Sequence, residues 1–205
     1  MNRYRGIMKW KKRECRRRRI RSCTKSEGKI EICMGMFFCM LIFLAVLCQV
    51  KLLQYQAIGA FVEDSLAAAG LASAVIDVRE YGRTHTIVVE SPESSFEKYK
   101  EALIYNLALD AGMQSRNEEV LLGKVDILSY QIFNVTGDVV TVYHFQEDGS
   151  LEGTESISLS QAYLPDGNKV ETTSVYSKVG FYVAGLNGER IYATKEKSVD
   201  IKGDG

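Results

Sequence analysis

The architecture of this chain follows from the segment "ECRRRRIRSCTKSEGKIEICMGMFFCMLIFLAVLCQVK", from Glu14 to Lys51. It joins an arginine-rich block to a long apolar run, with Glu31 at the junction. Residues 32–50 carry no charge, and as a helix they rise about 28 Å, close to the roughly 30 Å hydrocarbon core of a bilayer. The run also lacks the polar face of a helix on a soluble core. We therefore expect a transmembrane helix over residues 30–50.

The end of the apolar run distinguishes an anchor from a secretory signal. A cleaved signal has a shorter apolar region that closes on a small-x-small cleavage site. Here the run closes on Leu47, Cys48 and Gln49 instead. This favours an uncleaved, single-pass anchor in the cell membrane.

The charge distribution predicts the orientation of that anchor. The net charge is zero, yet residues 1–25 hold 12 of the 26 Lys and Arg residues and only one of the 26 acids. Basic residues beside a span stay in the cytoplasm. We expect residues 1–29 to be a basic cytoplasmic leader or tail and the C-terminal domain to be extracytoplasmic. Anionic lipid accounts for the basic cluster, and no nucleic-acid-binding motif accompanies it, so the expected partner is membrane lipid and not nucleic acid.

The helical pattern continues beyond Lys51. Apolar and small residues recur there at spacings of three and four, namely Ile58, Val62, Ser65, Ala69, Ala72 and Ile76. One helix is expected from about residue 30 to about 78, with residues 51–80 as its extracytoplasmic continuation. Its small side chains would let another helix or a sheet approach, and the candidate packing residues are Ala68, Ala69 and Ala72. Alanine also simply favours helix, and that explanation predicts no partner.

The remaining residues, 81–205, predict a small extracytoplasmic α+β domain. Residues 81–83 should break the helix, and residues 84–90 have the β-branched content of a strand. A capping box at Ser94 and Glu97 opens an amphipathic helix that should end near Gly112. Period-two hairpins follow over residues 124–145 and 175–199, turning at Gly137–Asp138 and Asn187–Gly188. Residues 149–169 should be a loop with at most a short strand.

The predicted domain shows no pattern that supports catalysis. Neither His85 nor His144 belongs to a metal-ligand motif, and there is no glycine-rich phosphate loop or nucleophile elbow. All five cysteines lie within residues 15–48, and none forms a CxxC pair. We expect no catalytic, cofactor-binding or metal site, and no enzyme activity.

The segment "SEGKIEICMGMFF", Ser26 to Phe38, resembles the prepilin leader of type IV filament systems. In that family a basic leader ends at a glycine, a membrane peptidase cuts after it, and a nearby glutamate helps the subunit enter a filament. The continuing helix and the strand-rich domain resemble the TadE-like pseudopilins of tight-adherence pilus systems. The resemblance implies a pilin-like domain in a membrane-anchored minor pseudopilin of a pilus or secretion-type assembly. Other pilin-like subunits and assembly platform proteins would be its partners.

The same resemblance implies that Gly28, Lys29 and Glu31 are the processing and assembly residues. The family places its glutamate fifth after the cut, whereas Glu31 is third after Gly28, and a cut two residues earlier would follow Ser26. A cleaved subunit and an uncut pseudopilin therefore both stay open. So do an assembly role for Glu31 and a simple position among lipid headgroups. The alternative function is a single-pass sensor or ligand-binding ectodomain.

Overall fold

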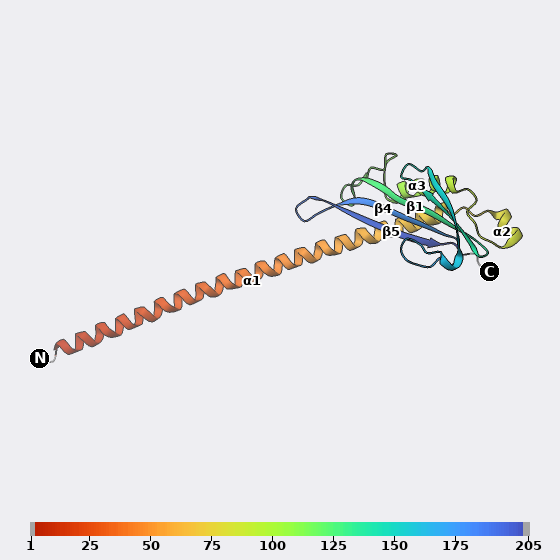
Figure 1. Ribbon diagram of the computed structural model, residues 1–205. Helices are drawn as coiled ribbons and strands as arrows, with labels where there is room; N and C mark the ends of the chain where they lie inside the picture. The colour runs from red at the N-terminus through yellow and green to blue at the C-terminus, as the bar shows by residue number, and fades with distance from the viewer. Residues whose placement is uncertain (1–2, 203–205) are drawn as a thin grey trace. The chain divides into compact units, whose positions relative to one another are not determined.

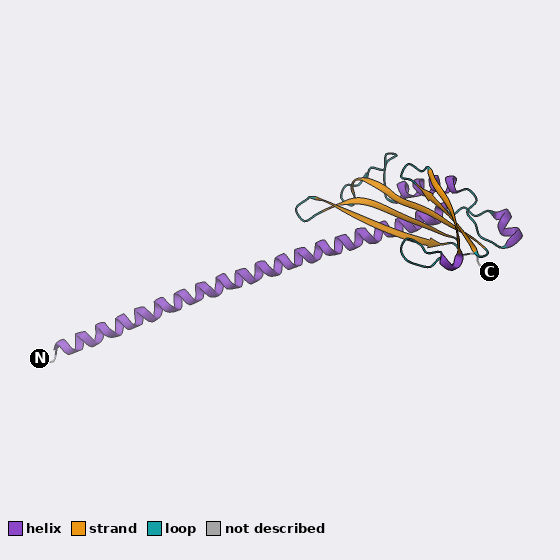
Figure 2. Cartoon of the chain, in the orientation of Figure 1, coloured by secondary structure: helices purple, strands orange, loops and turns teal. Residues whose placement is uncertain are grey.

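The computed structural model describes the backbone of residues 3–202 and the side chains of residues 30–202. The chain divides into two compact units, Met1–Leu53 and Gln54–Gly205, which we describe separately. The elements, shown in Figures 1 and 2, are α1 (Arg3–Ser73), α2 (Val78–Thr84), α3 (Pro92–Asn106), β1 (Leu122–Thr136), β2 (Val139–Phe145), β3 (Leu151–Ser158), the 3₁₀ turn η1 (Leu159–Gln161), β4 (Ser174–Ala184) and β5 (Arg190–Asp200). This confirms the α+β class.

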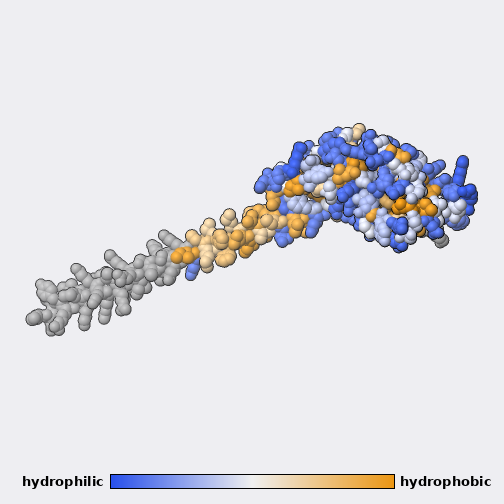
Figure 3. Space-filling view, in the orientation of Figure 1, coloured by the Kyte–Doolittle hydropathy of each residue, from blue (hydrophilic) through white to orange (hydrophobic). Residues whose placement is uncertain are grey.

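Unit 1 is the first part of α1. Within Ile30–Ser73 the helix contains a window with a mean hydropathy of 2.6, none of which is buried. Figure 3 shows the hydrophobic colours on the described part of this helix. Among the described residues it is the one helix that is long and apolar enough to cross a membrane. Membrane anchors and signal sequences share this length and composition.

Unit 2 is built on a five-stranded antiparallel sheet of order β3-β2-β1-β4-β5. Both predicted hairpins are confirmed. The β1–β2 turn places Gly137 at φ 60°, and the β4–β5 turn places Gly188 at φ 80°. Glycine adopts positive φ without steric cost, which explains why the chain reverses at these two positions.

The core of unit 2 lies between one face of the sheet and two helices. From α1 the fully buried side chains are Val62, Leu66 and Ala69, and from α3 they are Phe96, Tyr99 and Leu103. They pack against sheet residues that include Tyr130, Ile132 and Val179. Each fully buried large apolar side chain contributes about 1.5–3 kcal/mol to stability. The spacing of small and apolar residues predicted Val62 and Ala69 on this face of α1, whereas Ala72 from the same pattern is exposed.

The start and end of α3 differ from the prediction. The N-cap is Ser91, whose hydroxyl accepts the Ser94 amide at 3.4 Å, and Pro92 occupies the first turn. Proline suits that position because its missing N–H would have no partner there. The capping box predicted at Ser94 and Glu97 therefore lies inside the helix. The helix ends at Asn106, well before Gly112, and Ala108 takes the left-handed conformation with φ 51°.

The segment after α1 also differs. Helix α1 ends at Ser73 rather than near residue 78, and residues 81–83 lie inside the short helix α2. The strand predicted at residues 84–90 is reduced to one bridge, between Ile76 and Val89. Side chains take the place of a partner strand. Asn134 accepts the Val89 N–H at 2.9 Å and donates to its carbonyl at 3.2 Å, and the Thr173 hydroxyl donates to the carbonyl of Ile87.

The region predicted as a loop contains a full edge strand. Strand β3, Leu151–Ser158, pairs with β2 along most of its length. Most of its side chains are exposed on both faces, so the apolar alternation that reveals a strand is missing. The chain then turns back through η1 and covers the second face of the sheet. There Ala162, Leu164 and Val170 pack with Phe133, Val142 and Tyr176 in a smaller core.

Candidate functional site

The residues implied by the prepilin resemblance lie in unit 1. The side chains of Gly28 and Lys29 fall outside the described residues, and Glu31 is an exposed residue of α1. Their roles in processing and assembly therefore stay predictions.

The structure separates the three candidate packing alanines. Ala69 is fully buried in the core of unit 2, whereas Ala68 and Ala72 are exposed. Residues four apart share a helix face, and neighbouring residues are about 100° apart. Small residues permit a sheet to approach a helix closely. This approach occurs inside unit 2, at Gly70, the position after Ala69. A Cβ on Gly70 would lie 3.1 Å from Cγ2 of Val199. Ala69 thus serves the domain's own packing.

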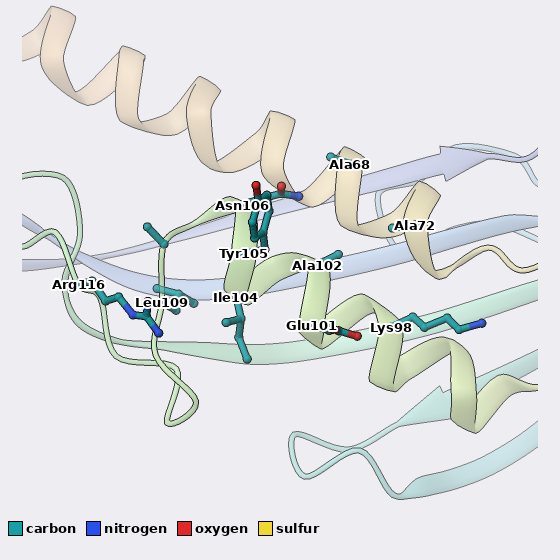
Figure 4. A pocket seen from close by; sticks show the side chains of 11 residues that line it. Ala68, Ala72, Lys98, Glu101, Ala102, Ile104, Tyr105, Asn106, Leu109 and Arg116 are labelled. Atoms are coloured by element: carbon teal, nitrogen blue, oxygen red, sulfur yellow. The ribbon is translucent and has the colours of Figure 1, made fainter.

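Ala68 and Ala72 line a groove between α1 and α3 with a volume of about 840 Å³ (Figure 4). Helix α3 contributes Lys98, Glu101, Ala102 and Tyr105 to this groove, and Arg116 follows from the next loop. Leu109, which is almost fully buried, belongs to the same lining. The groove therefore has apolar walls between two helices and charged groups of both signs on its lining.

Tyr105 is the residue of this groove that sequence reasoning missed. Its side chain is 86% exposed although it lies on α3 among well-packed aromatic residues. The buried face of α3 includes Tyr99 and Leu103, and Tyr105 is off that face. A large aromatic residue on the polar side of an amphipathic helix is the signal that could have found this surface.

Two neighbouring tyrosines show how unit 2 holds its helices on the sheet. The rings of Tyr99 and Tyr130 have centroids 4.6 Å apart. The Tyr130 hydroxyl donates to Oγ of Ser73 at 2.9 Å and lies 2.7 Å from Oγ of Ser95, which links α1, α3 and β1. Burial raises the pKa of Tyr130. The hydroxyl of Tyr99 is buried without a hydrogen-bond partner among the described residues, and burial raises its pKa as well.

A cluster of charges joins α1 to the edge strand β5. Glu63 accepts hydrogen bonds from Nζ of Lys197 at 2.9 Å and of Lys195 at 3.1 Å. The bond from Lys197 is the first cause that holds the pKa of Glu63 below its usual value, and Lys195 acts in the same direction. Lysines on an edge strand also oppose pairing with a foreign strand. The cluster therefore orients β5 and protects its free edge.

The histidine, cysteine and acidic side chains of the described residues do not gather at one metal site. Within residues 30–202 no group of three His, Cys, Asp or Glu side chains could hold a metal ion. His144 is half-buried in β2, and His85 is the left-handed C-cap of α2 with φ 58°. Cys33, Cys39 and Cys48 are exposed free thiols in unit 1.

The groove between α1 and α3 is therefore the candidate functional surface of unit 2. It combines two of the predicted packing residues with side chains of α3 and of the following loop. No family model, curated protein or solved structure matches this chain.

Proposed function

We propose that this chain is a membrane-anchored, pilin-like subunit, a minor pseudopilin of a pilus or secretion-type assembly. It acts by helix packing and surface contacts rather than by catalysis. One observation carries the proposal. The helix α1 contains both an apolar, fully unburied stretch and, in unit 2, the face that forms the core with the sheet. An anchor and a domain core that share one helix are what the prepilin resemblance implies.

The exposed flank of α1 beside its buried face in unit 2 supports a role in assembly. Ala68 and Ala72 are exposed there, and the groove beside them leaves room for a partner's side chains. The adjacent Leu71 is 58% exposed. In this proposal the basic N-terminus lies in the cytoplasm and unit 2 lies outside the membrane. Other pilin-like subunits and assembly platform proteins are the partners.

The second candidate function is a single-pass sensor or ligand-binding ectodomain. The observation that favours it is the size of the same groove, since ligand pockets have volumes of about 300–1,000 Å³. Lys98 and Arg116 on its lining suit an anionic ligand. The two functions differ in what covers the groove, a macromolecular neighbour or a small molecule.

Site-specific photo-crosslinking in native membranes separates these functions. Photoreactive residues at positions 68 and 72 sample the groove, position 31 samples the anchor, and exposed Glu155 on β3 is a matched control. We expect crosslinks to other pilin-like subunits from positions 68 and 72 and none from position 155. An uncrosslinked chain in cells that build the apparatus would contradict the assembly function. Thermal stabilisation of that chain by small anions would then favour the ectodomain.

A further inference from the structure

The β4–β5 hairpin lies at the same end of unit 2 as the first residues of its helix (Figure 1). The Tyr55 hydroxyl donates to the carbonyl oxygen of Ala184 at 3.2 Å. One turn further along the helix, the side chain of Lys195 crosses Gly59, where an added Cβ would lie 3.3 Å from Cε of the lysine. These contacts fix the base of the hairpin on the helix.

A contact at the other end of the hairpin fixes the direction of β4 relative to the helix. An added Cβ on Gly70 would lie 4.0 Å from Cγ1 of Val175, near the start of β4. Since β4 begins beside Gly70 and ends beside Tyr55, it runs antiparallel to the helix. The turn at residues 185–189 therefore lies at the end of unit 2 where its helix begins. That is the end of unit 2 at which the apolar run joins the chain.

Chain continuity limits how far this end can be from a membrane. Val50 closes the uncharged run, and Tyr55 is five positions later. Five helical residues rise about 7.5 Å, and even an extended chain spans at most about 18 Å. The headgroup layer on each side of the hydrocarbon core is about 5–8 Å thick. If the run spans a bilayer, as the proposed function requires, the hairpin turn lies near the headgroups.

The surface chemistry of this end fits that environment. Leu186 at the turn is 59% exposed, and Ile191 at the start of β5 is also exposed. The exposed Arg190 can extend its guanidinium to a phosphate while its stem stays in the apolar layer. The Glu189 carboxylate accepts the Asn187 N–H at 2.9 Å, so this backbone donor of the turn does not depend on water.

An apolar groove lies beneath the hairpin. It has a volume of about 240 Å³ and is lined mainly by Ile58, Phe181, Val183, Ile191 and Ala193. We propose that the β4–β5 turn and this groove form a second contact with the membrane. Leu186 enters the headgroup layer, and the groove takes the apolar part of a lipid. This inference rests on the proposed membrane anchor.

Fluorescence quenching by lipid tests this contact on the full chain in nanodiscs. Trp10 is the single tryptophan, so Trp10→Phe gives a dark background for Leu186→Trp. The matched control is Val139→Trp, at a position 48% exposed. It lies at the β1–β2 turn, at the opposite end of β1 from the residue that pairs with Tyr182. With bromine on the lipid acyl chains, we expect a loss of fluorescence at position 186 and none at position 139.

A third variant separates this contact from the anchor. Leu44→Trp lies in the middle of the apolar run and should be quenched if the run spans the bilayer. Quenching at 44 with none at 186 would overturn the hairpin contact and leave the anchor intact. No quenching at 44 would overturn both. The tryptophan at position 186 could also be shielded from aqueous iodide without being quenched by lipid. That result would show that a protein surface covers the turn, which also contradicts the proposal. Circular dichroism confirms that each variant is folded.

Discussion

The two halves of α1 share a backbone conformation and differ in how their side chains are used. In unit 1 the described residues are apolar and exposed on every side, from Phe37 to Val50. In unit 2 the same helix buries one face, with Val62, Leu66 and Ala69 in the core, and exposes Ala68 and Ala72 on the other. A helix that is apolar all round requires an apolar solvent, whereas a two-sided helix requires a core and water. One helix therefore combines a segment that is apolar all round with a segment that buries only one face.

Truncating a large core side chain should give the largest contrast between the halves. Leu66→Ala removes a fully buried side chain of unit 2 and should lower its free energy of unfolding by about 2–5 kcal/mol. Leu44→Ala, in unit 1, removes no packing from that core and should leave this free energy unchanged. Urea unfolding in detergent, followed by near-UV circular dichroism, measures both. Equal effects would show that the apolar run contributes to the core of unit 2.

Replacing alanine by leucine tests whether α1 in unit 2 has one buried and one exposed face. Ala69→Leu overfills a packed core and should cost about 1–3 kcal/mol. Ala68→Leu, one position away and exposed, should change the stability of unit 2 by less than about 0.5 kcal/mol.

The same pair of variants distinguishes folding from assembly. In the proposed function Ala68→Leu should weaken co-purification with pilin-like subunits while unit 2 stays folded. Ala69→Leu would weaken it only through unfolding. A loss of stability in Ala68→Leu, measured by the same urea titration, would contradict the division of the faces.

The sequence was sufficient wherever a local pattern decides the structure. The three- and four-residue spacing predicted the buried residues Val62 and Ala69 of α1, and turn residues Gly137 and Gly188 located both hairpins. The prediction of a strand at residues 84–90 failed because the partners of this segment are distant. The side chains of Asn134 and Thr173 bind part of its backbone, and only a short stretch pairs with residues 75–77.

The remaining misses concern surfaces. Strand β3 exposes most of its side chains on both faces, so it carries no alternation. The groove beside Ala68 forms only when α1 and α3 are packed on the sheet, and no spacing within either helix encodes it. The alanine pattern could indicate a close approach but not which alanine meets the core, because that choice depends on where the sheet contacts the helix.

The neighbouring residues Tyr99 and Tyr130 should show a smaller difference in stability within the core of unit 2. Tyr130→Phe removes the hydroxyl that links Ser73 and Ser95 and should cost about 1 kcal/mol. Tyr99→Phe removes a buried hydroxyl that has no hydrogen-bond partner among the described residues, so it should be neutral or slightly stabilising. Thermal unfolding of the two variants in parallel measures the difference. A cost for Tyr99→Phe as large as for Tyr130→Phe would show that the Tyr99 hydroxyl has a partner in solution.

The smallest expected effect is a pH dependence at the contact between α1 and β5. Lys197 and Lys195 hold the pKa of Glu63 below its usual value, so the carboxylate binds its proton less readily in the folded chain than in the unfolded one. The stabilisation is therefore complete above the unfolded pKa and is lost as the pH falls through the folded pKa. Because all three side chains are more than one-third exposed, the effect should be below about 1 kcal/mol and should weaken in salt. Glu63→Gln should remove this part of the acid sensitivity of unit 2, and its effect on stability should shrink as the pH falls, whereas Asp64→Asn, at the exposed neighbouring position, should not remove it. Urea midpoints measured between pH 3 and pH 7 test this, and identical pH profiles for Glu63→Gln and the parent chain would show that the two lysines do not stabilise the folded carboxylate.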